Sequence, residues 1–174
     1  MDKIVYQGIT YRRTGKDWSD MQGFIVHESL QKELNAIYVE TIDLFSLSVV
    51  EAIEHGDKFK SSSSYALALR FYEYAADRAS ERDLAVILPR MTACYRKQGH
   101  PQKVIDLLEY ASKKFGRKMI SSALLTSAAA AYCDLREYEK AKKCCNRAFA
   151  ASGGKGSGEL SLVYKRIRKE CGPD

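Results

Sequence analysis

Three stretches of this 174-residue chain repeat one another, and together they decide its fold. They read YALALRFYEYA at 65–75, PQKVIDLLEYA at 101–111 and YEKAKKCCNRA at 138–148. Each stretch ends in alanine and is preceded, six positions before its start, by an aromatic residue: Phe59, Tyr95 and Tyr132. These aromatic residues are 36 and 37 positions apart. Self-similarity at such a period predicts an array of stacked helical units, each too small to bury its apolar face alone.

Each unit is predicted to be two helices joined by a tight turn. In the first unit Ser48 and Glu51 form a capping box, which predicts a helix from Ser48 and a second helix over 65–80. The second unit is expected over 84–98 and, after Gly99-His100-Pro101, up to Phe115 and Gly116. Pro89 has to lie within the first turn of its helix, or that helix kinks. The third unit begins near Ser121, turns at 134–137 and ends before Gly153.

This pattern resembles the tetratricopeptide repeat family over roughly residues 48–155. The resemblance rests on the helix–turn–helix unit, the late aromatic residue of each first helix, and small or bulky residues at matching positions. These positions are Gly56/Thr92/Ala129, Ala68/Val104/Ala141, Tyr72/Leu108/Cys145 and Ala75/Ala111/Ala148. No Trp stands early in a first helix and no Pro closes a second helix, which departs from the family pattern. The resemblance implies an all-α fold of antiparallel helix pairs, stacked as a short right-handed superhelix.

The chain outside the repeats is expected to add a small extension at each end. Residues 1–27 hold a hairpin around Gln7-Gly8, followed by loop or strand, and 28–47 hold a helix over 28–40 and a connector. Three helix pairs then occupy 48–80, 84–116 and 121–153, within 48–155. Residues 156–174 form an amphipathic capping helix and a tail. The hairpin either caps the first face of the array or lies on a partner.

The resemblance implies that the first helices line a concave groove that holds a peptide or protein partner. Matching positions give the groove residues Ile53, Asp57, Lys60, Val86, Pro89, Ala93, Arg96, Lys97, Ala123, Thr126, Ala130, Cys133 and Asp134. The chaperone-binding members of the family grip a C-terminal carboxylate with Lys, Asn and Arg at such places. Most of these positions hold other residues here, so we expect a different partner. The fold alone gives only an analogy to function.

Charge suggests a second kind of partner. The net charge is +6, and the half from residue 88 onward carries most of the positive residues. They form three clusters, which are Lys113, Lys114, Arg117 and Lys118; Lys140, Lys142, Lys143 and Arg147; and Lys165, Arg166, Arg168 and Lys169. Such a surface either attracts nucleic acid or an acidic partner or is simply a solvated helix face. A third hypothesis is a small secretion-type chaperone, although such proteins tend to be acidic.

No constellation for catalysis stands out. The stretch SGGKGSG at 152–158 follows a helix, with its lysine misplaced for a phosphate loop, so we interpret it as a linker. The three histidines lie far apart, and the five cysteines show no zinc-ligand spacing, which predicts reduced, buried or half-buried thiols. We therefore expect a non-enzymatic protein without metal or cofactor. No apolar run is long enough for a membrane span, and we expect a cytoplasmic location.

Overall fold

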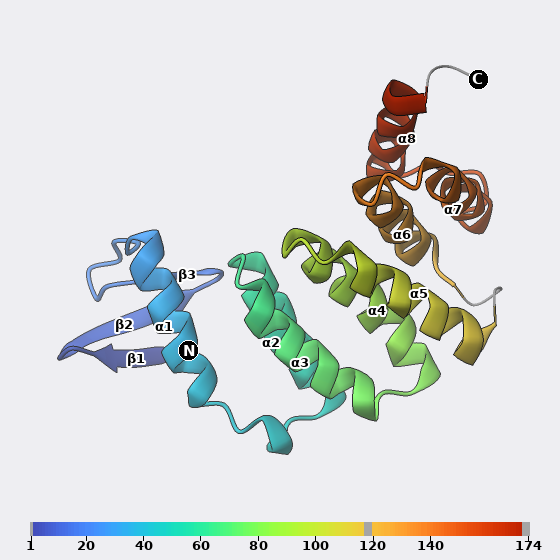
Figure 1. Ribbon diagram of the computed structural model, residues 1–174. Helices are drawn as coiled ribbons and strands as arrows, with labels where there is room; N and C mark the ends of the chain where they lie inside the picture. The colour runs from blue at the N-terminus through green and yellow to red at the C-terminus, as the bar shows by residue number, and fades with distance from the viewer. Residues whose placement is uncertain (1, 117–119, 172–174) are drawn as a thin grey trace. The chain divides into compact units, whose positions relative to one another are not determined.

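The computed structural model describes residues 2–116 and 120–171 and divides the chain into two compact units. The N-terminal unit comprises residues 1–78 and the C-terminal unit residues 79–174. The described residues form eight α-helices, a short 3₁₀ helix and a three-stranded sheet (Figure 1). The all-helical repeat fold with a small N-terminal β-extension is therefore confirmed.

The N-terminal sheet contains one strand more than the predicted hairpin. Strands β1 (Lys3–Tyr6), β2 (Ile9–Thr14) and β3 (Asp17–Ser19) pair antiparallel in the order β1-β2-β3. The predicted turn joins β1 to β2 with positive φ at both Gln7 (51°) and Gly8 (77°), as a two-residue turn of this kind requires. The third strand has only three residues, too few to show alternation in the sequence.

The helices of the N-terminal unit are α1 (Glu28–Glu40), η1 (Leu44–Ser46), α2 (Val49–Ser61) and α3 (Tyr65–Arg78). The sheet lies on α1 and α2. The indole Nε1 of Trp18, in β3, donates to Asn35 Oδ1 of α1 over 2.9 Å, and Arg13 Nη2, in β2, donates to the Lys58 carbonyl of α2 over 3.3 Å. The sheet therefore packs against α1 and α2.

Local signals place most helix ends of the N-terminal unit as predicted. Ser48 accepts from the Glu51 N–H, and the Glu51 carboxylate accepts from the Ser48 N–H over 2.9 Å, so the predicted capping box is confirmed. Helix α1 spans the predicted residues 28–40. Helix α3 ends at Arg78, two residues before the predicted end, because Ser80 is already the N-cap of the next helix.

The C-terminal unit comprises α4 (Glu81–Lys97), α5 (Pro101–Phe115), α6 (Ser122–Asp134), α7 (Tyr138–Ala151) and α8 (Gly158–Cys171). Helix α4 begins three residues before the predicted Leu84, because Ser80 and Asp83 form a second capping box. Pro89 consequently lies inside the helix and not in its first turn, which corrects the prediction. Since proline has no N–H, the carbonyl four residues earlier, at Ala85, loses its usual helical donor.

The positions that repeat in the sequence are the ones that pack helices together. The repeat residues of each second helix are at most 5% exposed: Ala68, Tyr72 and Ala75; Val104, Leu108 and Ala111; Ala141, Cys145 and Ala148. Helix α8 packs on α6 and α7 through Leu160, Val163 and Ile167, as predicted for a capping helix. Within the described residues, no helix has the length and apolar character needed to cross a membrane.

Candidate functional site

A pocket of about 480 Å³ in the C-terminal unit gathers several of the predicted groove residues. Three helices line it, each the first helix of a pair or, for α8, the helix that follows the last pair. The lining residues are Ala93, Arg96 and Lys97 from α4, Ala130 and Asp134 from α6, and Glu159, Leu162, Val163 and Arg166 from α8. Five of the nine, the α4 and α6 residues, were predicted for the groove, and Arg166 was predicted as part of a basic cluster.

The pocket combines a floor of small side chains with one exposed apolar residue. Ala93 and Ala130 are spaced by 37 residues, which is the repeat offset, so they occupy equivalent places on α4 and α6. Small side chains at such places let another chain approach closely. Leu162, on α8, is 65% exposed, whereas Val163 beside it is 6% exposed because it packs into the core. Leu162 therefore presents apolar surface to solvent.

Two ion pairs inside the pocket join α8 to the first helices. Arg96 Nη1, on α4, lies 2.7 Å from Glu159 Oε1 on α8. Arg166, on α8, pairs with Asp134 at the end of α6, and its Nη2 also donates to the Cys133 carbonyl over 3.1 Å. The hydrogen bond to Asp134 raises the pKa of Arg166.

Lys97 differs from the two arginines of the pocket. It is exposed, and no ion pair involves it among the described residues. The pocket therefore presents one available cation beside charges that are already matched.

The remaining predicted groove residues do not join this pocket. Ile53, Asp57 and Lys60 lie on α2, in the N-terminal unit, where Asp57 Oδ1 accepts from the Tyr72 hydroxyl over 2.6 Å. Val86 and Pro89 lie on α4 and Ala123 on α6, outside the lining.

Thr126 and Cys133, also predicted for the groove, are 2% and 0% exposed and do not line this pocket. Helix α6 contacts α4, α5, α7 and α8, which buries residues on nearly all of its sides. Sequence reasoning missed the contribution of α8. The amphipathic pattern of that helix predicted its packing but gave no sign that its polar side faces the same hollow as α4 and α6.

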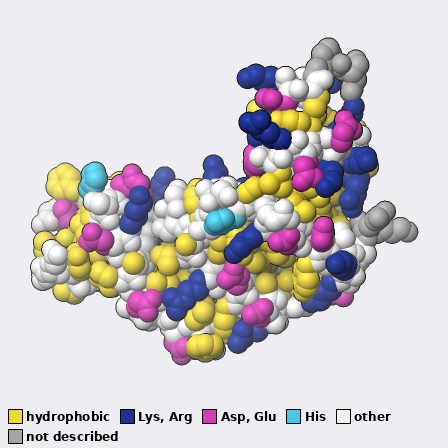
Figure 2. Space-filling view, viewed as in Figure 1, with side chains coloured by type: hydrophobic (Ala, Val, Ile, Leu, Met, Phe, Trp, Pro, Cys, Tyr) yellow, Lys and Arg dark blue, Asp and Glu magenta, His cyan; other side chains and the backbone are white. Residues whose placement is uncertain are grey.

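The predicted basic residues are spread over three helices. Lys113 and Lys114 lie on α5, Lys140, Lys142, Lys143 and Arg147 on α7, and Lys165, Arg166, Arg168 and Lys169 on α8, while Arg117 and Lys118 lie outside the described residues. Several have local partners: the Lys114 ammonium lies 5.3 Å from the Tyr110 ring, and Lys140 pairs with Glu137. On the face drawn in Figure 2, basic and acidic side chains are interspersed over this unit.

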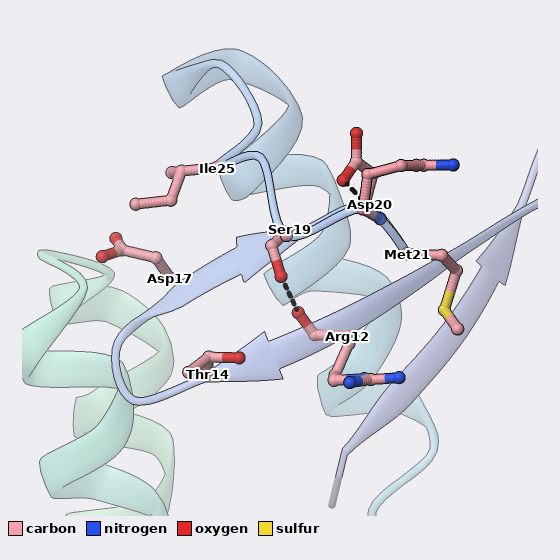
Figure 3. Close-up of a pocket in the computed structure, with 9 residues that line it drawn as sticks. Arg12, Thr14, Asp17, Ser19, Asp20, Met21 and Ile25 are labelled. Atoms are coloured by element: carbon pink, nitrogen blue, oxygen red, sulfur yellow. Dashed lines mark hydrogen bonds between the residues drawn. The ribbon is translucent and has the colours of Figure 1, made fainter.

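A second hollow, of about 430 Å³, lies in the N-terminal unit between β2, β3 and the loop that follows (Figure 3). Arg12 and Met21 stand on one side of it and Asp17 and Ile25 on the other. The Asp20 carboxylate accepts from the N–H groups of Gln22 and Phe24, over 3.0 and 2.9 Å, so it serves to hold the loop. None of the lining residues was predicted as functional.

The thiols are placed as structural groups, with one exception. Cys94, Cys133, Cys144 and Cys145 are buried, and burial raises the pKa of Cys145 to about 12. Cys171 is exposed, which differs from the prediction that all thiols are at least half-buried. In the described part of the chain no cluster of three or more His, Cys, Asp or Glu residues could hold a metal ion.

The paired helices and their buried repeat positions define a helical-repeat fold. Among solved structures, the chain is similar to the TPR domain of Sgt2 from Aspergillus fumigatus. The TM-score is 0.62 at 19% sequence identity, and the match covers 71% of this chain and 78% of that one. This likeness shows the fold and confirms the resemblance found in the sequence. No family model and no curated protein matches the sequence.

Proposed function

We propose that this protein is a non-catalytic interaction module that binds a peptide or protein segment in the pocket between α4, α6 and α8. The observation that carries the proposal is the convergence of Ala93, Ala130 and the exposed Leu162 on one hollow. A partner side chain placed there would bury apolar surface against small residues, while Lys97 would receive a carboxylate. The tetratricopeptide fold, which presents its first helices to a partner, is the background to this proposal.

The direct test places a bulky charge in the pocket. Ala93 is half-buried at the pocket wall, so Ala93→Arg fills the hollow without entering the core. Leu162→Arg likewise places a bulky charge in the hollow, from α8. Ala130 is 2% exposed, which makes arginine there a test of folding and not of binding. The matched control is Ala150→Arg, at an exposed position of α7 outside the pocket.

Partners are captured from a native lysate, identified, and their affinities measured by titration calorimetry. We expect the two pocket variants to weaken binding of the leading partner at least tenfold, about 1.4 kcal/mol, and the control to leave its affinity unchanged. Equal binding by all three variants would show that the partner does not use this pocket.

The second candidate is binding of nucleic acid or an acidic partner through the basic residues. The observation that favours it is the charge of the C-terminal unit, with 19 Lys and Arg against 10 Asp and Glu, a net +9, compared with −3 for the N-terminal unit. Neutralising phosphates makes such binding fall steeply with salt. If the partner stays bound after nuclease treatment and its affinity depends little on salt concentration, this candidate is excluded. A cytoplasmic location is also part of the proposal, and the buried thiols of Cys133, Cys144 and Cys145 favour it.

A further inference from the structure

Strand β1 is one edge of the N-terminal sheet, and half of its backbone groups point away from β2 (Figure 1). The Arg13 N–H donates to the Asp2 carbonyl over 2.9 Å, so these two residues form a hydrogen-bonded pair. Bonded and non-bonded pairs alternate along antiparallel strands. Lys3 and Val5 therefore occupy non-bonded positions, and their N–H and C=O groups face the free edge. Within the described residues these four groups have no hydrogen-bond partner.

The opposite edge of the sheet is already covered. Ser19, the last residue of β3, forms a bridge with Ile25, and the Val26 N–H donates to the Trp18 carbonyl over 3.0 Å. The loop after β3 thus occupies the place that a further strand would take. β1 is the edge at which an extended segment of another protein can add a strand through main-chain hydrogen bonds.

The face of the sheet that is turned away from the helices carries apolar and basic side chains at this edge. Side chains alternate along a strand, so Ile4 and Tyr11, 5% and 7% exposed, lie on the buried face. Val5 lies on the outer face and is 69% exposed. Lys3 and Arg12 are direct partners across β1 and β2, so they lie side by side on the outer face.

These two cations lack acidic partners. Neither Lys3 nor Arg12 takes part in an ion pair within the described residues, and like charges directly opposite one another destabilise a sheet. Arg12 Nε is buried and has no hydrogen-bond partner in the described part of the chain. Arg12 also lines the second hollow, beside the exposed side chains of Met21 and Ile25 (Figure 3). A carboxylate placed at this edge would offset the repulsion, so the edge favours an acidic partner.

A second copy of the chain fits this edge poorly. If two β1 strands paired antiparallel, Lys3 and Arg12 of one protomer would approach the same two residues of the other. Four cations would then gather along one seam, which opposes pairing. Lysine on an edge strand is a common means of preventing self-association. The same lysine leaves the edge open to a strand that carries an acid.

We propose that β1 is a docking edge for an extended, acidic segment of a partner protein, which adds to β1 antiparallel, like the other strands of this sheet. The segment bonds to the outward N–H and C=O groups of Lys3 and Val5. Its residue opposite Val5 is apolar, and its residue two positions later, opposite Lys3, is acidic. Neighbouring strands are about 4.8 Å apart, so the acid also comes within reach of the long Arg12 side chain. The docking edge belongs to the N-terminal unit alone and is a different site from the pocket of the C-terminal unit.

The probes are two blocked peptides, acetyl-TSVTESTS-amide and acetyl-TSVTKSTS-amide, which differ only in the residue placed opposite Lys3. Binding to the full chain is followed by NMR titration of the backbone amides. We expect the glutamate peptide to shift the Lys3 and Val5 amides most, and to bind at least about fivefold more tightly than the lysine peptide. No saturable shift with the glutamate peptide at millimolar concentration, or equal binding of both peptides, would overturn the proposal.

Exchanging the charge at the edge tests the assigned register. Lys3→Glu should weaken binding of the glutamate peptide at least about fivefold and strengthen binding of the lysine peptide, so that the preference is reversed. Lys16→Glu is the matched control, because it makes the same change of net charge in the turn between β2 and β3, away from β1. It should leave the preference for the glutamate peptide intact. A preference that survives in Lys3→Glu, or that is lost in Lys16→Glu, contradicts the proposal.

A third variant tests the main-chain hydrogen bonds. Val5→Pro removes one outward N–H at a position where an edge strand tolerates proline, so binding of the glutamate peptide should be largely lost. Unchanged affinity in a Val5→Pro protein that keeps its fold would show that the peptide does not use this edge. If Val5→Pro does not fold, the charge exchange still decides the question. Sedimentation velocity tests the alternative occupant: a monomer supports an open edge, whereas a dimer that Lys3→Glu disrupts would assign the edge to a second copy.

Discussion

Gly56 is the position at which one added methyl group should change the free energy of unfolding most strongly. It lies in the middle of α2 and is buried, and an added Cβ would sit 2.4 Å from Cε1 and 2.7 Å from Cδ1 of Tyr72 on α3. The Tyr72 ring is 0% exposed, and its hydroxyl donates to Asp57 Oδ1 over 2.6 Å. The ring cannot move aside without disturbing both its packing and this hydrogen bond.

The size of the effect follows from three opposing contributions. Alanine in place of glycine in a helix interior normally stabilises by about 1 kcal/mol. Overpacking a well-filled core costs about 1–3 kcal/mol. Weakening a hydrogen bond to a carboxylate costs about 1.5–3 kcal/mol, less where the group is partly solvated. We therefore expect Gly56→Ala to lower the free energy of unfolding by about 1–3 kcal/mol, opposite in sign to the helix-propensity effect.

Urea unfolding followed by Trp18 emission measures this change, because Trp18 lies in the same unit as α2 and α3. Gly158→Ala is the control, since an added Cβ there meets nothing within 4 Å at the start of α8. In a Tyr72→Leu background the cost of Gly56→Ala should shrink or reverse, which a double-mutant cycle reports. If Gly56→Ala is as stable as the parent or more stable, the close packing of α2 on α3 is not as described.

Two further outcomes follow from the structure. Ser48→Ala removes the capping box of α2 and should lower the free energy of unfolding by about 1 kcal/mol, measured by the same urea titration; an unchanged midpoint would contradict the cap. In native protein at pH 8 we expect one fast-reacting thiol per chain in a thiol-reagent assay, and Cys171→Ser should abolish it, because Cys171 is exposed whereas burial raises the pKa of Cys145 to about 12 and shields it. Several fast thiols in the native protein would refute the buried placement.

The helix pairs were predictable because short-range signals determine them. The Ser48–Glu51 capping box, Pro101 at the first position of α5 and Gly116 after its end act within one turn of chain. Where prediction was wrong, a similar signal had been overlooked. Ser80 and Asp83 form a capping box with aspartate in the place usual for glutamate, so α4 starts earlier and Pro89 falls in its interior.

The site was predictable only in part, because it depends on a helix outside the repeats. Repeat spacing identified Ala93 and Ala130 as equivalent positions on successive first helices. It carried no information on α8, which supplies Glu159, Leu162 and Arg166 to the same pocket. The position of a helix that follows a glycine-rich linker is set by long-range packing, here by Leu160 and its apolar neighbours against α6 and α7, and not by any local rule.

The ion-paired charges of the pocket affect which partner it would select. Exposed pairs such as Arg96–Glu159 contribute only about 0–1 kcal/mol, so a partner carboxylate could replace Glu159 at little cost. Affinity would then come from apolar burial on Leu162, whereas the net charge of the C-terminal unit would accelerate encounter with acidic partners. These two contributions can be distinguished by measuring association and dissociation rates. Added salt should slow association with an acidic partner, and Leu162→Arg should speed dissociation. The pocket and the basic surface can therefore both contribute to binding of the same partner.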